Sequence, residues 1–338
     1  MKRTEKLFLI GVLGACILTA SCSRSGHDKL YSVAFYNVEN LFDTIHDDGK
    51  LDQDFLPDGS YQWTAEKYES KLRNLAQVLG SLAREQTPDG PAFIGLAEVE
   101  NSRVLADLVA QEPIANYRFV HQEGPDKRGI DCALLYDPNQ FILNNVQLVE
   151  SKPFQGDTTK PTRGFLIVDG QLDGEHLCVI VNHWPSRGAA SPVRVHSATQ
   201  VRALTDSLSL LDEKMKIIVM GDMNDDPMDE SMQTLGGKKQ VEEVQAGEFY
   251  NPWWATLEDD TIGTLLYRGK WNLFDQIVLS KTLLGGKGLH YHGHEVFRRD
   301  YLIQQEGRYA GSPLRTHGSG QWLNGYSDHL PTIVYLKN

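Results

Sequence analysis

A series of short apolar runs, each about the length of one β-strand, recurs through most of the chain. The runs cover residues 31–37, 93–98, 132–136, 164–168, 177–183, 216–220, 276–280 and 330–336. Two intervening stretches have helical periodicity: one follows Thr64, a candidate N-cap, and the other spans about residues 193–211. Alternating strands and helices predict the α/β class.

Polar residues stand at the ends of these apolar runs. Some follow a strand and others precede one: Asn37, Glu39, Glu98, Asn182, His183, Asp222 and Asn224 follow, whereas Asp275, Asp328 and His329 precede. If all of them meet at one edge, the later strands must run opposite to the earlier ones. This disfavours a purely parallel, doubly wound sheet. It favours two mixed β-sheets packed face to face with helices outside, a four-layered α/β sandwich.

The segment KIIVMGDMNDDP shows the most concentrated negative charge next to a buried strand. Carboxylates crowded at Asp222, Asp225 and Asp226 repel one another, and burying them is unfavourable unless positive charge lies nearby. A metal ion or an imidazolium would supply that charge. We interpret Asp222 as functional, and Asp225 and Asp226 as loop caps or solvent-facing groups.

Length and charge limit the domain organisation and the partners. The chain has 338 residues, is 41% hydrophobic and carries a formal net charge of −12. No repeat or linker follows residue 30, so residues 31–338 are expected to form one domain after a short tether at residues 22–30. The acidic balance argues against holding a polyanion by bulk attraction, so phosphate would be bound by local arginines and metal ions.

The N-terminal residues 1–21 have the basic and apolar regions of an export signal. Small residues before Cys22 resemble a bacterial lipoprotein signal, in which this cysteine is acylated; Cys16 is a second candidate, and plain signal cleavage is an alternative. The sequence thus predicts a lipid-anchored protein of the cell envelope, in the periplasm or on the outer membrane, or else a secreted one. The remaining cysteines, Cys132 and Cys178, are expected to be buried thiols; a disulfide between them is the alternative.

Six motifs occur in one order along the chain: FYNVEN, GLAEVEN, VNHWPSR, GDMND, FDQIVLS and YSDHLP. Together they resemble the endonuclease/exonuclease/phosphatase superfamily, from residue 37 to residue 329. Each motif alone is weak, but six in order at the edges of apolar runs form a strong signal. The resemblance implies a metal-dependent hydrolase of phosphate esters with the four-layered α/β sandwich.

Hard oxygen ligands suit Mg²⁺ or Mn²⁺ better than Zn²⁺. The predicted metal ligands are Asn37, Glu39, Glu98 and Asp328. By resemblance, Asp222 orients or deprotonates the attacking water and Asn224 holds a phosphate oxygen. His183 is expected to donate to the phosphate, and His329 to contact it or act as a base while Asp275 holds its tautomer.

Several arginines lie in loops that contain glycine or proline and could bind further phosphate groups. Arg128, Arg187 and Arg315 are the predicted substrate-binding residues, with Arg163 as another candidate; surface salt bridges are the alternative. The favoured activity is that of a monomeric phosphodiesterase of the nuclease kind, with a phosphate ester and possibly nucleic acid as partner. The alternatives are a phosphatase or phospholipase C acting on a small or lipid-linked phosphate, and a non-catalytic binding lipoprotein.

Overall fold

The computed structural model describes residues 29–259 and 261–338. Two mixed β-sheets form the centre of this part of the chain. The first is six-stranded, in the order β14 (His290–Val296), β17 (Thr332–Lys337), β1 (Leu30–Leu41), β2 (Phe93–Val99), β4 (Asp131–Tyr136) and β3 (Arg118–His121). The second is seven-stranded, in the order β5 (Phe141–Val149), β6 (Phe165–Leu172), β7 (Glu175–His183), β8 (Lys216–Asp222), β13 (Asp275–Ser280), β10 (Phe249–Tyr250) and β9 (Gly237–Lys238).

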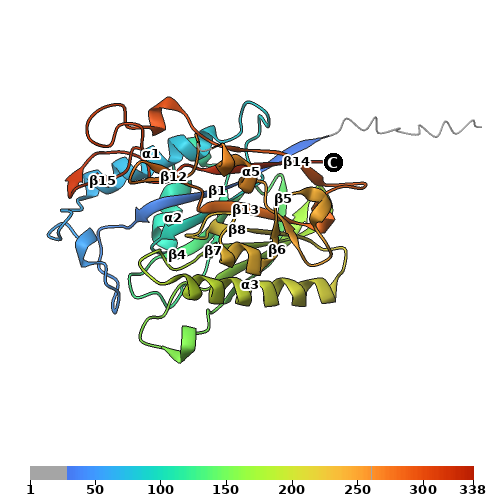
Figure 1. Cartoon of the computed structure of the whole chain (residues 1–338). Helices are drawn as coiled ribbons and strands as arrows, with labels where there is room; N and C mark the ends of the chain where they lie inside the picture. The colour runs from blue at the N-terminus through green and yellow to red at the C-terminus, as the bar shows by residue number, and fades with distance from the viewer. Residues whose placement is uncertain (1–28, 260) are drawn as a thin grey trace, which may run out of the picture.

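Helices cover the outer faces of the two sheets. Figure 1 shows α1 (Ala65–Ser81) and α3 (Ser191–Leu211) on opposite sides of the sheet pair. Shorter helices are α2 (Ser102–Val109), α4 (Glu230–Leu235) and α5 (Trp253–Glu258). Two small hairpins pair β11 (Leu265–Tyr267) with β12 (Lys270–Asn272), and β15 (His317–Gly318) with β16 (Gln321–Trp322). The predicted four-layered sandwich is confirmed.

Strand directions follow the expectation that the later strands run opposite to the earlier ones. In the first sheet β1 is parallel to β2 and antiparallel to β17. In the second, β7 is parallel to β8, and β8 is antiparallel to β13. The C-terminal ends of β1, β2, β7 and β8 therefore lie at the same edges as the beginnings of β13 and β17.

The apolar core lies between the two sheets and beneath the helices. One cluster of buried side chains joins both sheets and α1, and a second lies between the second sheet and α3. At Gly95 of β2, an added Cβ would lie 2.5 Å from Sδ of Met220 on β8. Glycine therefore allows this contact between the sheets, a few residues before Glu98 in β2 and Asp222 at the end of β8.

Some sequence expectations differ in detail from the structure. Thr64 precedes α1 in an extended conformation, as expected of an N-cap, but its side chain makes no capping hydrogen bond. Strand β5 was not predicted, because its polar side chains interrupt the apolar run at the edge of the second sheet. Cys132 and Cys178 are both free and buried, which confirms the predicted thiols.

The expected export signal, residues 1–21, and the acylation candidates Cys22 and Cys16 lie outside the described residues. Within residues 29–259 and 261–338, no helix combines the length and the hydropathy that a membrane span needs.

Candidate active site

Three buried polar residues lie side by side where neighbouring strands of the second sheet end or begin. His183 is the last residue of β7, Asp222 the last of β8 and Asp275 the first of β13. In the strand register Asp222 is the partner of His183 on one side and of Asp275 on the other. Nε2 of His183 lies 3.6 Å from Oδ2 of Asp222. The sheet thus brings together residues that are about 90 positions apart in the sequence.

His329 and Asp275 form a hydrogen-bonded pair at this edge. Nδ1 of His329 lies 2.6 Å from Oδ2 of Asp275, and both side chains are buried. Burial alone would lower the pKa of His329, but the carboxylates of Asp275 and Asp328 raise that pKa well above its ordinary value. This direction favours the protonated ring, whose Nε2 lies 3.9 Å from Oδ2 of Asp222.

Glu98 reaches the site from a β-bulge in the first sheet. The register shifts between Ala97 and Val99, so Glu98 is an extra residue opposite β4, and its φ of 65° is left-handed. A bulge re-aims the side chain of the residue it carries, at the cost of backbone strain. Oε2 of Glu98 accepts a hydrogen bond from the backbone N–H of Asn40 at 2.9 Å. Its Oε1 lies 3.8 Å from Nε2 of His183.

Hydrogen bonds fix the carboxylate of Asp222. Its Oδ1 accepts from the backbone N–H of Asn224 at 2.9 Å, and its Oδ2 accepts from Nδ2 of Asn37 at 3.0 Å. Burial raises the pKa of Asp222 to about 7, with Asp275 adding to the rise and His329 opposing it. Asn224 itself has a left-handed φ of 51°, and its Nδ2 donates to the carbonyl of Trp184 at 2.9 Å.

Glu39 and Asp328 lie at the first-sheet side of the site and share an arginine. Nε of Arg315 donates to Oε1 of Glu39 at 3.3 Å, and the same guanidinium donates to Asp328. The backbone N–H of Thr316 donates to Oε2 of Glu39 at 2.6 Å. Burial, and then the charge of Asp328, raise the pKa of Glu39 to about 7. Arg315 is thus engaged with two of the predicted metal ligands, and its predicted substrate contact stays a prediction.

A buried lysine that the sequence analysis missed supports this side. Lys71 of α1 is fully buried, and its Nζ donates to Oγ1 of Thr316 at 2.5 Å and to the carbonyl of Tyr326 at 2.6 Å. Burial lowers its pKa to about 8, although Glu39 and Asp328 act in the opposite direction. Lys71 holds the segment that carries Arg315 and Asp328.

The donor set fits a divalent metal ion. Oε1 of Glu98 and Oδ2 of Asp222 lie 3.8 Å and 3.6 Å from the same atom, Nε2 of His183. Oδ1 of Asp275 is buried and has no hydrogen-bond partner among the described residues. Asp222, Asp275 and His329 place ligand-type atoms within 4.8 Å of one another. Because the ring of His329 is hydrogen-bonded to Asp275, the two carboxylates are the oxygen donors of this group. Burial is the main cause of the raised pKa of Asp222, and a cation at this point would add to the stabilisation that His329 gives to the charged carboxylate. An oxygen-rich set of this kind suits Mg²⁺ or Mn²⁺.

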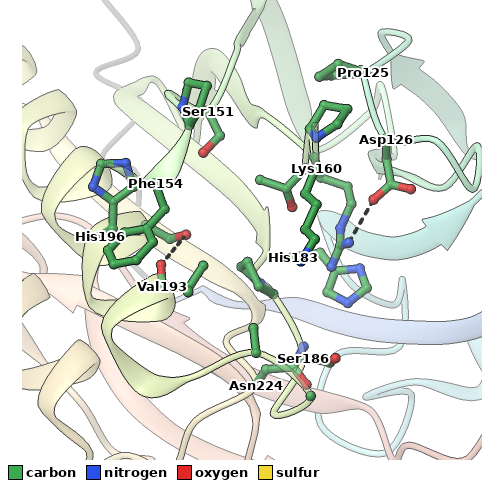
Figure 2. A pocket seen from close by; sticks show the side chains of 18 of the residues that line it. Pro125, Asp126, Ser151, Phe154, Lys160, His183, Ser186, Val193, His196 and Asn224 are labelled. Carbon is green, nitrogen blue, oxygen red and sulfur yellow. Dashed lines mark hydrogen bonds and ion pairs between the residues drawn. The ribbon is translucent and has the colours of Figure 1, made fainter. Parts of the chain in front are cut away.

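A cavity of about 1090 Å³ opens in front of these residues (Figure 2). One end is lined by Glu98, His183, Asp222, Asn224, Asp328 and His329. The far wall is the segment 150–163, from which Lys160 extends into the cavity, and Phe154 packs on His196 of α3. Arg163 is buried and ion-paired to Asp126 at 2.9 Å. Arg128 lines the cavity with a half-exposed side chain, 3.9 Å from Asp126.

Asp225 and Asp226, which follow Asp222 in the segment KIIVMGDMNDDP, belong to a separate network with Arg187. The guanidinium of Arg187 donates to Asp226 at 3.0 Å and to Asp229 at 2.8 Å. Asp226 also accepts from the backbone N–H of Leu273 at 2.8 Å, and Nε of Arg194 lies 2.8 Å from Asp225. Both aspartates are buried. Asp226 caps a loop, as predicted, because it accepts the backbone N–H of Leu273. The alternative that Asp225 and Asp226 face solvent is wrong, because both are buried.

Several solved structures have a similar fold, and one of them is named a phosphatase. Humanized D. rerio TDP2 with 14 mutations has a TM-score of 0.56 and 15% identity, over 91% of this chain and 99% of that chain. A mannosyl-6-phosphatase of Bacteroides thetaiotaomicron has a TM-score of 0.56 and 17% identity, over 90% of this chain and 99% of that chain. The human Nocturnin catalytic domain with bound sulfate has a TM-score of 0.54 and 15% identity, over 91% of this chain and 97% of that chain. At these identities the likeness concerns the fold. No protein of curated function matches the chain.

The family comparison covers nearly the whole described chain. The model of the Endonuclease/Exonuclease/phosphatase family matches residues 32–338, which contain nearly all of both sheets and every residue of the site. The chain belongs to the endonuclease/exonuclease/phosphatase family.

Proposed function

We propose that the chain is a divalent-metal-dependent hydrolase of phosphate esters that acts as a phosphodiesterase. The observation that carries this proposal is the buried row of His183, Asp222 and Asp275, with His329 paired to Asp275 and Glu98 facing the same point. A phosphodiester is an anion that repels hydroxide. Its hydrolysis needs charge neutralisation, an oriented water and a stabilised leaving oxygen, and these residues can supply the protein's part of all three.

Glu98 and Asn37 would hold the metal ion, with Glu39 and Asp328 beside them. When bound, the ion supplies charge neutralisation at the phosphate and at the leaving oxygen. Arg315 would then balance the remaining carboxylate charge, since its guanidinium already contacts Glu39 and Asp328. Mg²⁺ and Mn²⁺ are the proposed ions because the available donors are oxygens.

The remaining polar residues would orient the water and the phosphate. Asp222 accepts hydrogen bonds from Asn224 N–H and Asn37 Nδ2, which fix its carboxylate for a water in the cavity. The imidazolium of His329 presents Nε2 on the same side and would donate to a phosphate oxygen. His183 and Asn224, which also line the cavity, are placed for further donation to the phosphate.

Two features bear on the substrate. The cavity is larger than a phosphate group needs, and its far side carries Arg128, Lys152 and Lys160 together with Glu150 and Asp157. Mixed charge favours a substrate of limited length over a long polyanion, in line with the net charge of −12. Similar structures include D. rerio TDP2 with a single-strand DNA product and the mannosyl-6-phosphatase, so an oligonucleotide end and a small phosphorylated molecule are both candidate substrates.

The phosphatase or phospholipase C alternative differs from a phosphodiesterase only in the group bound beyond the scissile phosphate. The test is a panel containing bis(4-nitrophenyl) phosphate, 4-nitrophenyl phosphate, a single-stranded oligonucleotide, inositol phosphates and sphingomyelin, each assayed with Mg²⁺ or Mn²⁺. We expect turnover of the diesters, and faster turnover of monoesters would favour a phosphatase. If no phosphate ester is hydrolysed with either ion, the enzymatic proposal fails and a binding lipoprotein becomes the better reading.

We also propose that Cys22 is acylated and anchors the mature chain in the cell envelope. The basic and apolar residues before it, and the small residues next to it, support this proposal.

A further inference from the structure

A second group of metal-ligand side chains lies at the base of the β3–β4 hairpin. It consists of His121, Glu123 and Asp131. His121 ends β3, Asp131 begins β4, and Glu123 lies in the segment that connects them. One ring nitrogen of His121 and one carboxylate oxygen from each acid all lie within 4.8 Å of one another. None of these residues has a part in the proposed hydrolysis.

The ring of His121 points an unpaired nitrogen into this group. Its side chain is 1% exposed, and Nε2 has no hydrogen-bond partner within residues 29–259 and 261–338; Oδ2 of Asp131 is 3.4 Å away. A buried polar atom left without a partner destabilises the fold. The other ring nitrogen, Nδ1, lies 3.2 Å from Oγ of Ser102. In a histidine that ligates a metal through one nitrogen, a hydrogen bond at the other nitrogen fixes the orientation of the ring.

Among the described residues, no lysine or arginine donates a hydrogen bond to either carboxylate. Asp131 is buried, and its two oxygens accept from the backbone N–H of Gly124, at 3.1 Å. Glu123 is 57% exposed, and its Oε2 is 4.0 Å from Nζ of Lys50. Lys50 directs its hydrogen bonds to the carbonyls of Gly124 and Asp126, at 3.2 Å each. The negative charge between His121 and Asp131 is therefore not neutralised by a hydrogen-bonded side chain.

We propose that His121, Glu123 and Asp131 bind a divalent transition-metal ion of the Zn²⁺ class, separate from the metal of the active site. One imidazole nitrogen and two carboxylate oxygens are ligands that Zn²⁺ accepts in tetrahedral sites, whereas the oxygen-only set at Glu98 suits Mg²⁺. Water would complete the coordination on the exposed side of Glu123.

An ion at this position would join the two ends of the segment 122–130. The tip of that segment carries Asp126, which is ion-paired to Arg163 at 2.9 Å, and Arg128, which lines the cavity. The proposed site is therefore structural: it would fix one wall of the substrate cavity by holding the base of the segment that forms it.

The test is the binding of Zn²⁺ to the full protein in a Glu98→Gln background with excess Mg²⁺, which reduces binding at the active site. Isothermal titration and metal analysis after dialysis would count the bound ions, and thermal unfolding would record stabilisation. We expect His121→Ala to bind one equivalent fewer, or to bind that equivalent at least about 100-fold more weakly, and to lose the rise in Tm that Zn²⁺ causes.

A matched control is His176→Ala. His176 is also close to two carboxylates, 2.6 Å from Asp169 and 3.7 Å from Asp212, but its nitrogen is already hydrogen-bonded. We expect this variant to keep the parent's Zn²⁺ binding. If His121→Ala does not fold, Asp131→Asn provides the same comparison. Equal Zn²⁺ stoichiometry and equal stabilisation in the parent and either cluster variant would overturn the proposal.

Discussion

Asp222 and Asp275 are direct cross-strand partners in the antiparallel pairing of β8 and β13, and both are buried. Two carboxylates at this spacing repel each other, so each needs a different compensating group. His329 serves Asp275 through a hydrogen bond of 2.6 Å, while Asp222 receives donors from Asn37 and Asn224. The two acids therefore have different roles: Asp275 orients a histidine, and Asp222 faces the cavity.

The first prediction concerns the pair formed by His329 and Asp275. Asp275→Asn keeps the size but removes the charge that stabilises the imidazolium. We expect kcat to fall on the order of 10²–10⁴-fold with little change in KM, and His329→Ala to cost about as much. The double variant should be scarcely worse than either single variant, because groups that act as a unit are not additive.

The control for this prediction is Asp169→Asn, which breaks another aspartate–histidine contact of 2.6 Å, to His176, away from the cavity. It should leave kcat unchanged. Asp226→Ala would be a poor control, because Asp226 accepts a hydrogen bond from the backbone N–H of Leu273, two residues before Asp275. Losses that simply multiply in the Asp275 and His329 double variant would show that the two residues act independently.

The second prediction concerns the metal of the active site. Excess EDTA should abolish activity, and Mg²⁺ or Mn²⁺ should restore it while Zn²⁺ restores little, because the donors around Glu98 are oxygens. Glu98→Gln removes the charge of the bulged residue and should raise the Mg²⁺ concentration needed for half-maximal rate by at least about tenfold. Glu66→Gln, on the exposed start of α1, is the control. Undiminished turnover in EDTA would exclude the metal mechanism.

Much of the fold could be predicted because the sequence pattern and the sheet geometry agree. Each predicted apolar run is a strand within a few residues, and the helix after Thr64 is α1. The polar residues at strand ends required antiparallel later strands, and the structure has them. Strand β5 was missed because an edge strand is only partly buried, so its pattern carries a weaker apolar signal.

The arrangement within the site was less predictable, because it depends on backbone kinks and on tertiary partners. No residue type in the sequence around Glu98 indicates the β-bulge at this position. Lys71 looks like an ordinary helical lysine, yet its position beneath Thr316 and Tyr326 buries it completely. The partners of Arg187 come from a loop some 40 residues later. Such contacts join residues that are far apart in the sequence, so the residue pattern around each of them does not predict the contact.

The third prediction concerns the N-terminus. If Cys22 is acylated, the wild-type protein should sediment with membranes, and Cys22→Ala should be soluble or remain unprocessed. Mass spectrometry of the N-terminal peptide would detect the lipid, and Cys16→Ala is the matched control that should still be anchored. A wild-type protein found wholly in the soluble fraction, with a free N-terminus, would indicate plain secretion.

The fourth prediction concerns stability in acid. Nε2 of His294 lies 2.7 Å from Oγ1 of Thr256, its Nδ1 lies 2.7 Å from the Tyr291 hydroxyl, and burial lowers its pKa to about 4. Between about pH 6.5 and pH 4 the unfolded chain binds a proton that the folded chain does not, so stability falls as the pH falls. The loss is at most about 3 kcal/mol at pH 4.

His294→Gln should reduce the difference in the free energy of unfolding between pH 8 and pH 5, measured by urea titration at both values. His292→Gln, at an exposed position on the same strand, should leave that difference unchanged. An unchanged difference in the His294 variant would mean that this ring is protonated in the folded state.

The last prediction concerns Arg128 and Arg187, which the sequence analysis predicts as substrate-binding residues but which have different contacts in the structure. Arg128 lines the cavity with a half-exposed guanidinium 3.9 Å from Asp126, so it is free to bind substrate. Arg128→Ala should raise KM about tenfold, the equivalent of about 1.4 kcal/mol, with unchanged stability. Arg187 instead donates to Asp226 and Asp229 and stacks on Phe274. Arg187→Ala leaves a buried carboxylate short of a partner, so it should lower the free energy of unfolding by about 1–3 kcal/mol.

Steady-state kinetics and urea unfolding of both variants distinguish these roles. Lysine substitutions refine the comparison, because a lysine can keep a charge contact with substrate but cannot reproduce the fork of bonds from Arg187 to Asp226 and Asp229. Arg128→Lys should therefore recover part of the lost affinity, whereas Arg187→Lys should recover little stability. A higher KM in Arg187→Ala at unchanged stability would reverse the assignment: it would mean that this guanidinium leaves its carboxylates to bind the substrate.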